Sequence, residues 1–66
     1  MNSHEKTMII VEKFGMCAEK IAEITNKAQS TIYDKLKQRK YNKFGEQDYN
    51  KIREYCFEAI EEIKKN

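Results

Sequence analysis

The chain contains no proline, and no stretch of it alternates apolar and polar residues for the length of a β-strand. Glutamate, lysine and isoleucine are abundant, and charged residues make up 36% of the sequence. In the final third of the chain, apolar residues recur at intervals of three and four, which is the spacing of one face of an α-helix. The sequence therefore predicts an all-α fold.

At 66 residues the chain is long enough for one small domain, which we place at residues 1–66. A chain this short buries only about 60% of its unfolded surface, so its stability is marginal unless something adds to the core. A disulfide is not expected, because Cys17 and Cys56 are far apart and are better explained as small buried apolar residues. The only histidine, His4, is expected in a frayed N-terminus, which supports neither a metal site nor catalysis. Helix packing or self-association must then stabilise the fold.

The longest apolar run covers residues 8–11 and is flanked by Lys6 and Lys13. Four apolar residues are too few for the core of a signal peptide or for a membrane-spanning helix. We therefore expect a soluble cytoplasmic protein with reduced thiols and no membrane partner.

Capping and turn residues divide the chain into four or five predicted helices. We expect Ser3 to cap the first helix and Gly15 to end it in the left-handed conformation that glycine adopts at low cost. The second helix is predicted to begin near Cys17 and to end at Asn26, because asparagine tolerates that conformation better than most residues. The later helices are predicted over residues 28–38 and 46–64, the last being much the longest.

The second and third predicted helices form a helix-turn-helix over about residues 17–38. Ala22, in the second predicted helix, is small enough for the third to cross close to it. Ile32 and Leu36 follow ten and fourteen residues later and can pack on the inward side of the third predicted helix. The same spacings also occur in ordinary helical hairpins. In the loop that follows, either Tyr41 or Phe44 is expected to fold back onto the core.

Positive charge is concentrated in the second helix of this pair and in the loop after it. Residues 27–43 contain one acid, Asp34, and six bases, a local charge of +5. The bases are Lys27, Lys35, Lys37, Arg39, Lys40 and Lys43. The segments on either side are mildly acidic, so the whole-chain charge of +2 conceals this concentration. A helix pair with a polar, basic second helix is one way to place side chains in the major groove of DNA.

Several short motifs lie in and around this part of the chain. They are Gly15-Met16-Cys17, Lys20-Ile21-Ala22-Glu23, Gln29-Ser30-Thr31-Ile32-Tyr33 and Lys35-Leu36-Lys37, followed by Phe44 and by Asp48-Tyr49 with Ile52. Together they resemble the helix-turn-helix of small phage Cro-type and lambdoid-repressor-like proteins. The resemblance implies a bundle of five helices or fewer, dimeric operator binding and transcriptional control, often in a mobile element. Three turn positions depart from the pattern, because Asn26 replaces a glycine, Lys27 an apolar residue and Ala28 a serine or threonine.

If the third helix enters the major groove, its first residues are best placed to contact bases. Gln29 suits adenine and Ser30 several bases, whereas Asp34 and Lys37 lie one and two turns further along the same face. The residues predicted to contact the DNA backbone are Thr31, Tyr33, Arg39, Lys40 and Lys43. The alternative is an ordinary solvated helix face.

The last helix carries a second signal. Tyr49, Ile52, Cys56, Ala59 and Ile63 follow the alternating spacing of a helix that packs on one partner. The first half of this stripe is expected to close the core. A nineteen-residue helix is about 28 Å long, however, and outruns its neighbours. We therefore predict a dimer contact at Tyr55, Phe57, Ile60 and Ile63, although the stripe alone also fits a monomer.

These features predict a repressor-like transcriptional regulator from a phage or mobile element that binds double-stranded DNA as a homodimer. The alternatives are a protein-binding module of the same fold, such as an antirepressor or other phage-encoded inhibitor, and an accessory DNA-binding factor in recombination or partition. An enzyme is not expected, because the sequence offers no paired nucleophile and base and no glycine-rich phosphate loop. Neither a cofactor nor a small-molecule ligand is predicted.

Overall fold

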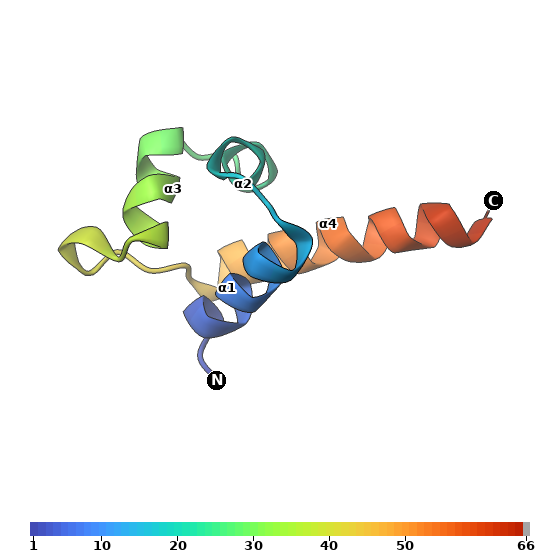
Figure 1. Ribbon diagram of the computed structural model, residues 1–66, viewed down its shortest axis with the longest axis horizontal. Helices are drawn as coiled ribbons and strands as arrows, with labels where there is room; N and C mark the ends of the chain where they lie inside the picture. Colours follow the sequence, from blue (N-terminus) through green and yellow to red (C-terminus); the bar gives the residue numbers. More distant parts are fainter. Residues whose placement is uncertain (66) are drawn as a thin grey trace.

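The computed structural model describes residues 1–65 and, within them, contains four α-helices and one 3-10 turn (Figure 1). The elements are α1 (Ser3–Phe14), α2 (Ala18–Thr25), α3 (Gln29–Leu36), the 3-10 turn η1 (Arg39–Tyr41) and α4 (Glu46–Lys65). No strand occurs in this described part of the chain. The prediction of a small all-α bundle with a long final helix is confirmed.

The helices pack around the first half of α4 only. In Figure 1, α1 lies beside that half, α2 and α3 lie above it, and the second half of α4 extends past every other element. The molecule accordingly measures 43 Å along its longest axis but only 25 and 19 Å along the others. Half of the longest helix is therefore left without a neighbour in the monomer.

The core joins all four helices and the loop before α4. Its buried apolar residues are Val11, Ala18, Ile21, Ala22, Ile32, Phe44 and Ile52. Leu36, which was predicted to pack under α3, lies at the edge of this core and is half-buried. Of the two aromatic candidates in the loop, Phe44 folds inward with 2% of its surface exposed, whereas Tyr41 is 95% exposed.

The helix ends follow the predicted turn residues with one exception. Gly15 and Asn26 both adopt the left-handed conformation, with φ of 61° and 57°, as expected. The amide of Lys27 then donates to the carbonyl of Ala22 at 3.0 Å, which closes the end of α2. Ser3 does not cap α1, because Asn2 does so through its side-chain oxygen, which accepts from the amide of Glu5 at 2.8 Å.

Two further expectations from the sequence are wrong. His4 is buried rather than frayed, because its Nδ1 accepts a hydrogen bond from the amide of Phe44 at 3.1 Å and its ring stacks on the Phe44 ring with centroids 5.6 Å apart. The cysteines are not small core residues, because Cys17 is exposed and Cys56 is only half-buried. His4 thus connects the N-terminal helix to the loop before α4.

Stability should fall as the pH drops below about 6.5. Burial, together with the nearby charge of Lys43, lowers the pKa of His4, and only the neutral ring can accept from the Phe44 amide. Below the ordinary histidine pKa, the unfolded chain takes up a proton that the folded chain does not, so the free energy of unfolding decreases by at most about 1.4 kcal/mol per pH unit. Urea titrations between pH 7.5 and 5.5 test this. A His4→Gln variant with the same decline would contradict it.

Candidate nucleic-acid interface

The outer face of α3 is polar and uncovered. Ile32 is fully buried beneath the helix, which turns Gln29, Ser30 and Lys37 outward into solvent. Tyr33 lies on the same exposed side, whereas Thr31 is half-buried. The side chains predicted to contact bases therefore lie on one surface, on which Asp34 is partly exposed one turn after Ser30.

Asp34 pairs with Arg39, one of the residues predicted to contact the DNA backbone. Its carboxylate lies 3.9 Å from a guanidinium nitrogen of Arg39, and both side chains remain partly exposed. An ion pair this long at the surface contributes little stability. It does bring the end of α3 and the start of η1 together, so Asp34 is placed to orient Arg39 as well as to accept from a base.

Two of the six basic residues in the central segment pair with an acid of α4, and only one of the two is buried. Lys35 is only 9% exposed and its ammonium lies 2.7 Å from one carboxylate oxygen of Asp48, while Lys27 donates to the other oxygen at 2.8 Å. Burial alone would raise the pKa of Asp48, but the hydrogen bonds from the two lysines lower it below its usual value. For Lys35 the effect of burial is the larger one, so its pKa is lowered although the hydrogen bond to Asp48 opposes this.

Asp48 also caps α4. Its carboxylate accepts the amide of Gly45 at 3.1 Å, three residues earlier, which is the reciprocal half of a capping box. This carboxylate therefore joins the turn after α2, the helix α3 and the start of α4 through three hydrogen bonds. We refer to Lys27, Lys35 and Asp48 as the lysine–aspartate clamp. It was not predicted from the sequence, where the two lysines were counted as surface charge.

The remaining positive charge lies in the loop that follows α3. Lys37, Arg39, Lys40 and Lys43 are all exposed, and in Figure 1 this loop projects at the end of the molecule opposite the C-terminus. Its backbone is unusual, because Gln38, Lys40 and Tyr41 have φ of 52°, 53° and 64° although none is glycine. Each such residue costs on the order of 1 kcal/mol, and conformations of this kind cluster at functional sites.

The residues predicted for a dimer contact are all exposed on α4 from its midpoint onward, but they do not share one surface. Tyr55, Ile60 and Ile63 line an apolar groove, together with residues from α1 and α2. Phe57 lies apart from this groove among the acids of α4, and the Arg53 guanidinium lies 5.8 Å from the centre of its ring. The groove therefore includes Tyr55, Ile60 and Ile63 but not Phe57.

Within residues 1–65, no cluster of three potential ligands is arranged to hold a metal ion. No helix in that part of the chain combines the length and the apolar character that crossing a membrane requires. No family model matches the sequence, and neither a curated protein nor a solved structure is significantly similar to it.

Proposed function

We propose that this protein is a repressor-like transcriptional regulator of a phage or mobile element, which acts in the cytoplasm by binding an operator in double-stranded DNA as a homodimer. The observation that carries the proposal is the outer face of α3, which is polar, exposed and adjacent to the basic loop. An α-helix of eight residues is about 12 Å long, and the major groove is about 12 Å wide. α4 does not cover this face, because it is joined to α3 on the inward side, where Lys35 meets Asp48.

We expect the charges of the interface to make a modest electrostatic contribution to the affinity for DNA. Lys37, Arg39, Lys40 and Lys43 are available to phosphates, whereas Lys27 and Lys35 are committed to Asp48. Each neutralised phosphate contributes about −0.9 to the slope of log affinity against log salt concentration. Four contacts per chain therefore correspond to a slope of roughly −3.6, less than the six basic residues of the segment would give.

Gln29→Ala should weaken binding to the preferred site by roughly 5- to 150-fold while changing binding to random duplex much less, because a bidentate contact with a base is worth about 1–3 kcal/mol. Lys40→Ala should weaken both equally and make the salt slope shallower by about 0.9, because phosphate contacts carry no sequence information. A preferred site selected from a random duplex library, followed by fluorescence anisotropy at several salt concentrations, provides the measurement.

Lys51→Ala is the matched control for Lys40→Ala, because Lys51 is an exposed lysine on α4, outside the proposed interface. It should leave affinity and salt slope unchanged. Equal loss of preferred and random binding in Gln29→Ala would remove Gln29 from the residues that contact bases. If the wild-type chain retained no duplex at low salt, DNA binding itself would be contradicted and a protein-binding module of the same fold would be favoured.

A further inference from the structure

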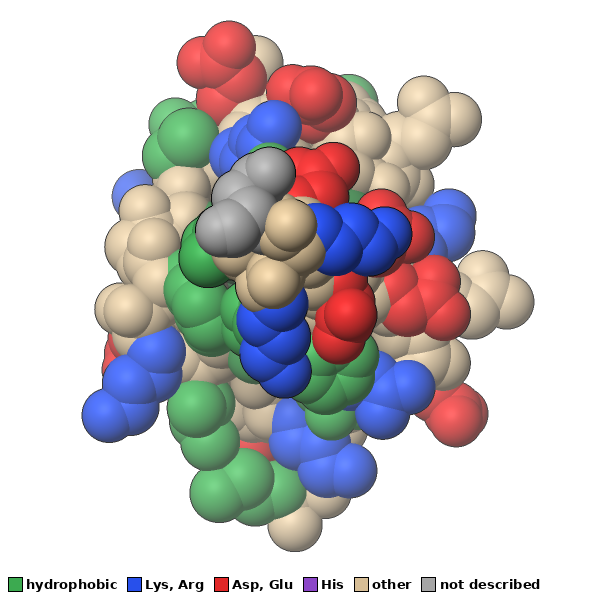
Figure 2. Space-filling model, turned by 90° about the vertical axis from the view of Figure 1, so that its right-hand side faces the viewer, with side chains coloured by type: hydrophobic (Ala, Val, Ile, Leu, Met, Phe, Trp, Pro, Cys, Tyr) green, Lys and Arg blue, Asp and Glu red, His purple; other side chains and the backbone are tan. Residues whose placement is uncertain are grey.

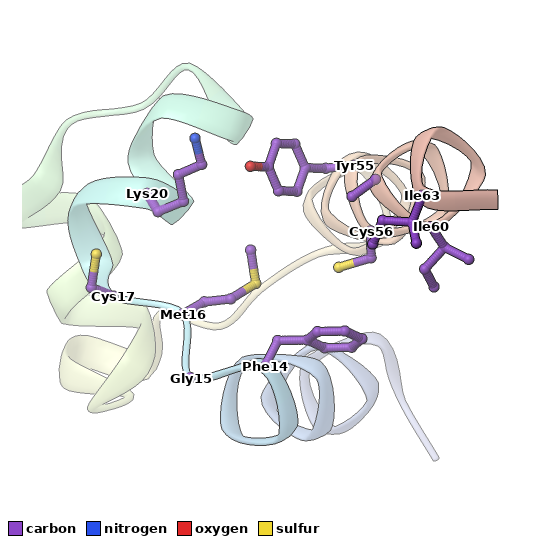
Figure 3. A pocket seen from close by; sticks show the side chains of 10 residues that line it. Phe14, Gly15, Met16, Cys17, Lys20, Tyr55, Cys56, Ile60 and Ile63 are labelled. Carbon is purple, nitrogen blue, oxygen red and sulfur yellow. The ribbon is translucent and has the colours of Figure 1, made fainter. Parts of the chain in front are cut away.

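An apolar groove of about 490 Å³ runs along the unpartnered half of α4. Figure 3 shows Phe14 at the end of α1 and Met16 in the link to α2 facing Cys56 and Ile60 of α4 across it. Lys20 lies at the rim, with its ammonium 5.0 Å from the centre of the Tyr55 ring. Phe14 is 59% exposed here, so the monomer leaves a large apolar surface in water.

The same face of α4 also carries a projecting side chain. Ile63, near the end of the helix, is 73% exposed and lies about two turns beyond Cys56 at the middle of the groove. The acids Glu54, Glu58 and Glu61 lie on the other side of the helix. Seen from the C-terminal end, hydrophobic side chains form a band on the left and below, while most acidic ones lie above and to the right (Figure 2). One face of α4 thus has both a hollow and a side chain that can fill one.

We propose that the groove is occupied by α4 of a second copy of this chain, which runs antiparallel to the first about a two-fold axis between Ala59 and Ile60. The apolar positions 56, 59, 60 and 63 have the same spacing in both directions along the chain, which a two-fold antiparallel pair requires. In this register Ile63 of the second copy lies opposite Cys56 and fills the hollow beside Met16. The contact is self-complementary, so it closes at two copies.

The apolar area available agrees with a weak, reversible dimer. Phe14, Tyr55, Ile60 and Ile63 together expose roughly 400 Å² per chain, if a large apolar side chain presents about 200 Å² in full. With the flanking residues, two copies would bury about 1,000 Å², at the lower limit of specific interfaces. We therefore expect association that depends on protein concentration and that DNA strengthens.

The register also fits the proposed DNA-binding function, on which this step rests. Asp48, which holds α3 through Lys35, lies about 17 Å along α4 from the axis at 1.5 Å per residue. The two copies of Asp48 are then about 34 Å apart along the paired helices. Successive major-groove sites on one side of DNA are separated by about 34–36 Å, or one helical turn. The dimer would therefore suit an imperfect palindrome with half-sites about 10 bp apart.

The register is tested with cysteines. In a Cys17→Ser background, Ile63→Cys should form an intermolecular disulfide with the native Cys56 of the second copy under mild oxidation. The proposed register places these two positions opposite each other, and a disulfide requires Cα atoms about 4.4–6.8 Å apart. The covalent dimer should be the main product at high protein concentration without DNA. The matched control is Glu61→Cys in the same background, on the outer face of α4, which should remain largely monomeric. Ile63 is exposed, so its replacement should not impair folding.

Three results would overturn the proposal. The first is a wild-type chain that sediments as a monomer at several hundred micromolar. The second is a Glu61→Cys control that forms as much disulfide-linked dimer as Ile63→Cys does. The third is an unchanged yield of disulfide-linked dimer when Cys56→Ser is added to Ile63→Cys, which indicates parallel pairing. Ile63→Glu should weaken the dimer at least tenfold and abolish cooperative binding to two half-sites, while binding to one half-site is kept. If the wild type binds duplex only as a monomer, the dimer fails, but DNA binding through α3 stands.

Discussion

Asp48→Ala should lower the free energy of unfolding by about 3–5 kcal/mol, which is the cost of leaving a buried charge without its partner. The replacement removes the acceptor of the buried Lys35, of Lys27 and of the Gly45 amide that begins α4. A domain of this size has a total stability of only about 3–10 kcal/mol, so a large fraction of the variant should be unfolded at 25 °C. Circular dichroism during urea and thermal unfolding provides the measurement.

The control is Asp34→Ala, because Asp34 has only the long surface contact with Arg39 and its loss should change stability by less than about 0.5 kcal/mol. Adding Lys35→Met to Asp48→Leu should recover much of the loss, because a buried ion pair can often be replaced by apolar side chains of similar volume. A single Asp48→Ala variant as stable as the wild type would show that the clamp is solvated in solution and does not hold α3.

The clamp also predicts the acid limit of stability. The two lysines lower the pKa of Asp48, so on acidification the unfolded chain binds a proton at this carboxyl before the folded chain does. Its contribution is complete above the ordinary aspartate pKa of about 4 and is lost as the pH falls through the lower folded value. This window lies below that of His4, so the two contributions are separable in one pH series.

The elements of the fold were predictable because their signals are local. Gly15 and Asn26 end their helices through backbone conformations that the residues themselves favour, and both are left-handed in the structure. Ile32 is the buried apolar residue of α3, and on a short helix its position largely decides which face is exposed. The exposed positions of Gln29 and Ser30 follow from the same pattern.

The contacts that hold the candidate interface were not predictable in the same way, because they join residues distant in sequence. The His4 ring meets Phe44 across 40 residues, and Lys27 meets Asp48 across 21. A count of charges along the chain therefore reveals neither that Lys35 is buried nor that both lysines pair with Asp48. One signal was available, because Lys27 occupies a turn position where the resemblance implies an apolar side chain. A lysine there keeps its ammonium at the surface, where it is free to pair with an acid from another helix.

Phe44→Ala should lower the free energy of unfolding about as much as Asp48→Ala does. Tyr41→Ala, three residues earlier in the same loop, should change it by less than about 0.5 kcal/mol. Removing a buried phenylalanine costs about 3–5 kcal/mol, and Phe44 supports both the His4 ring and the Lys35 ammonium, which lies 5.9 Å from its ring centre. Phe44→Leu should lose much less because it leaves a smaller cavity. Equal urea midpoints for Phe44→Ala and Tyr41→Ala would contradict the arrangement, because only Phe44 anchors the basic loop to the core that orients α3.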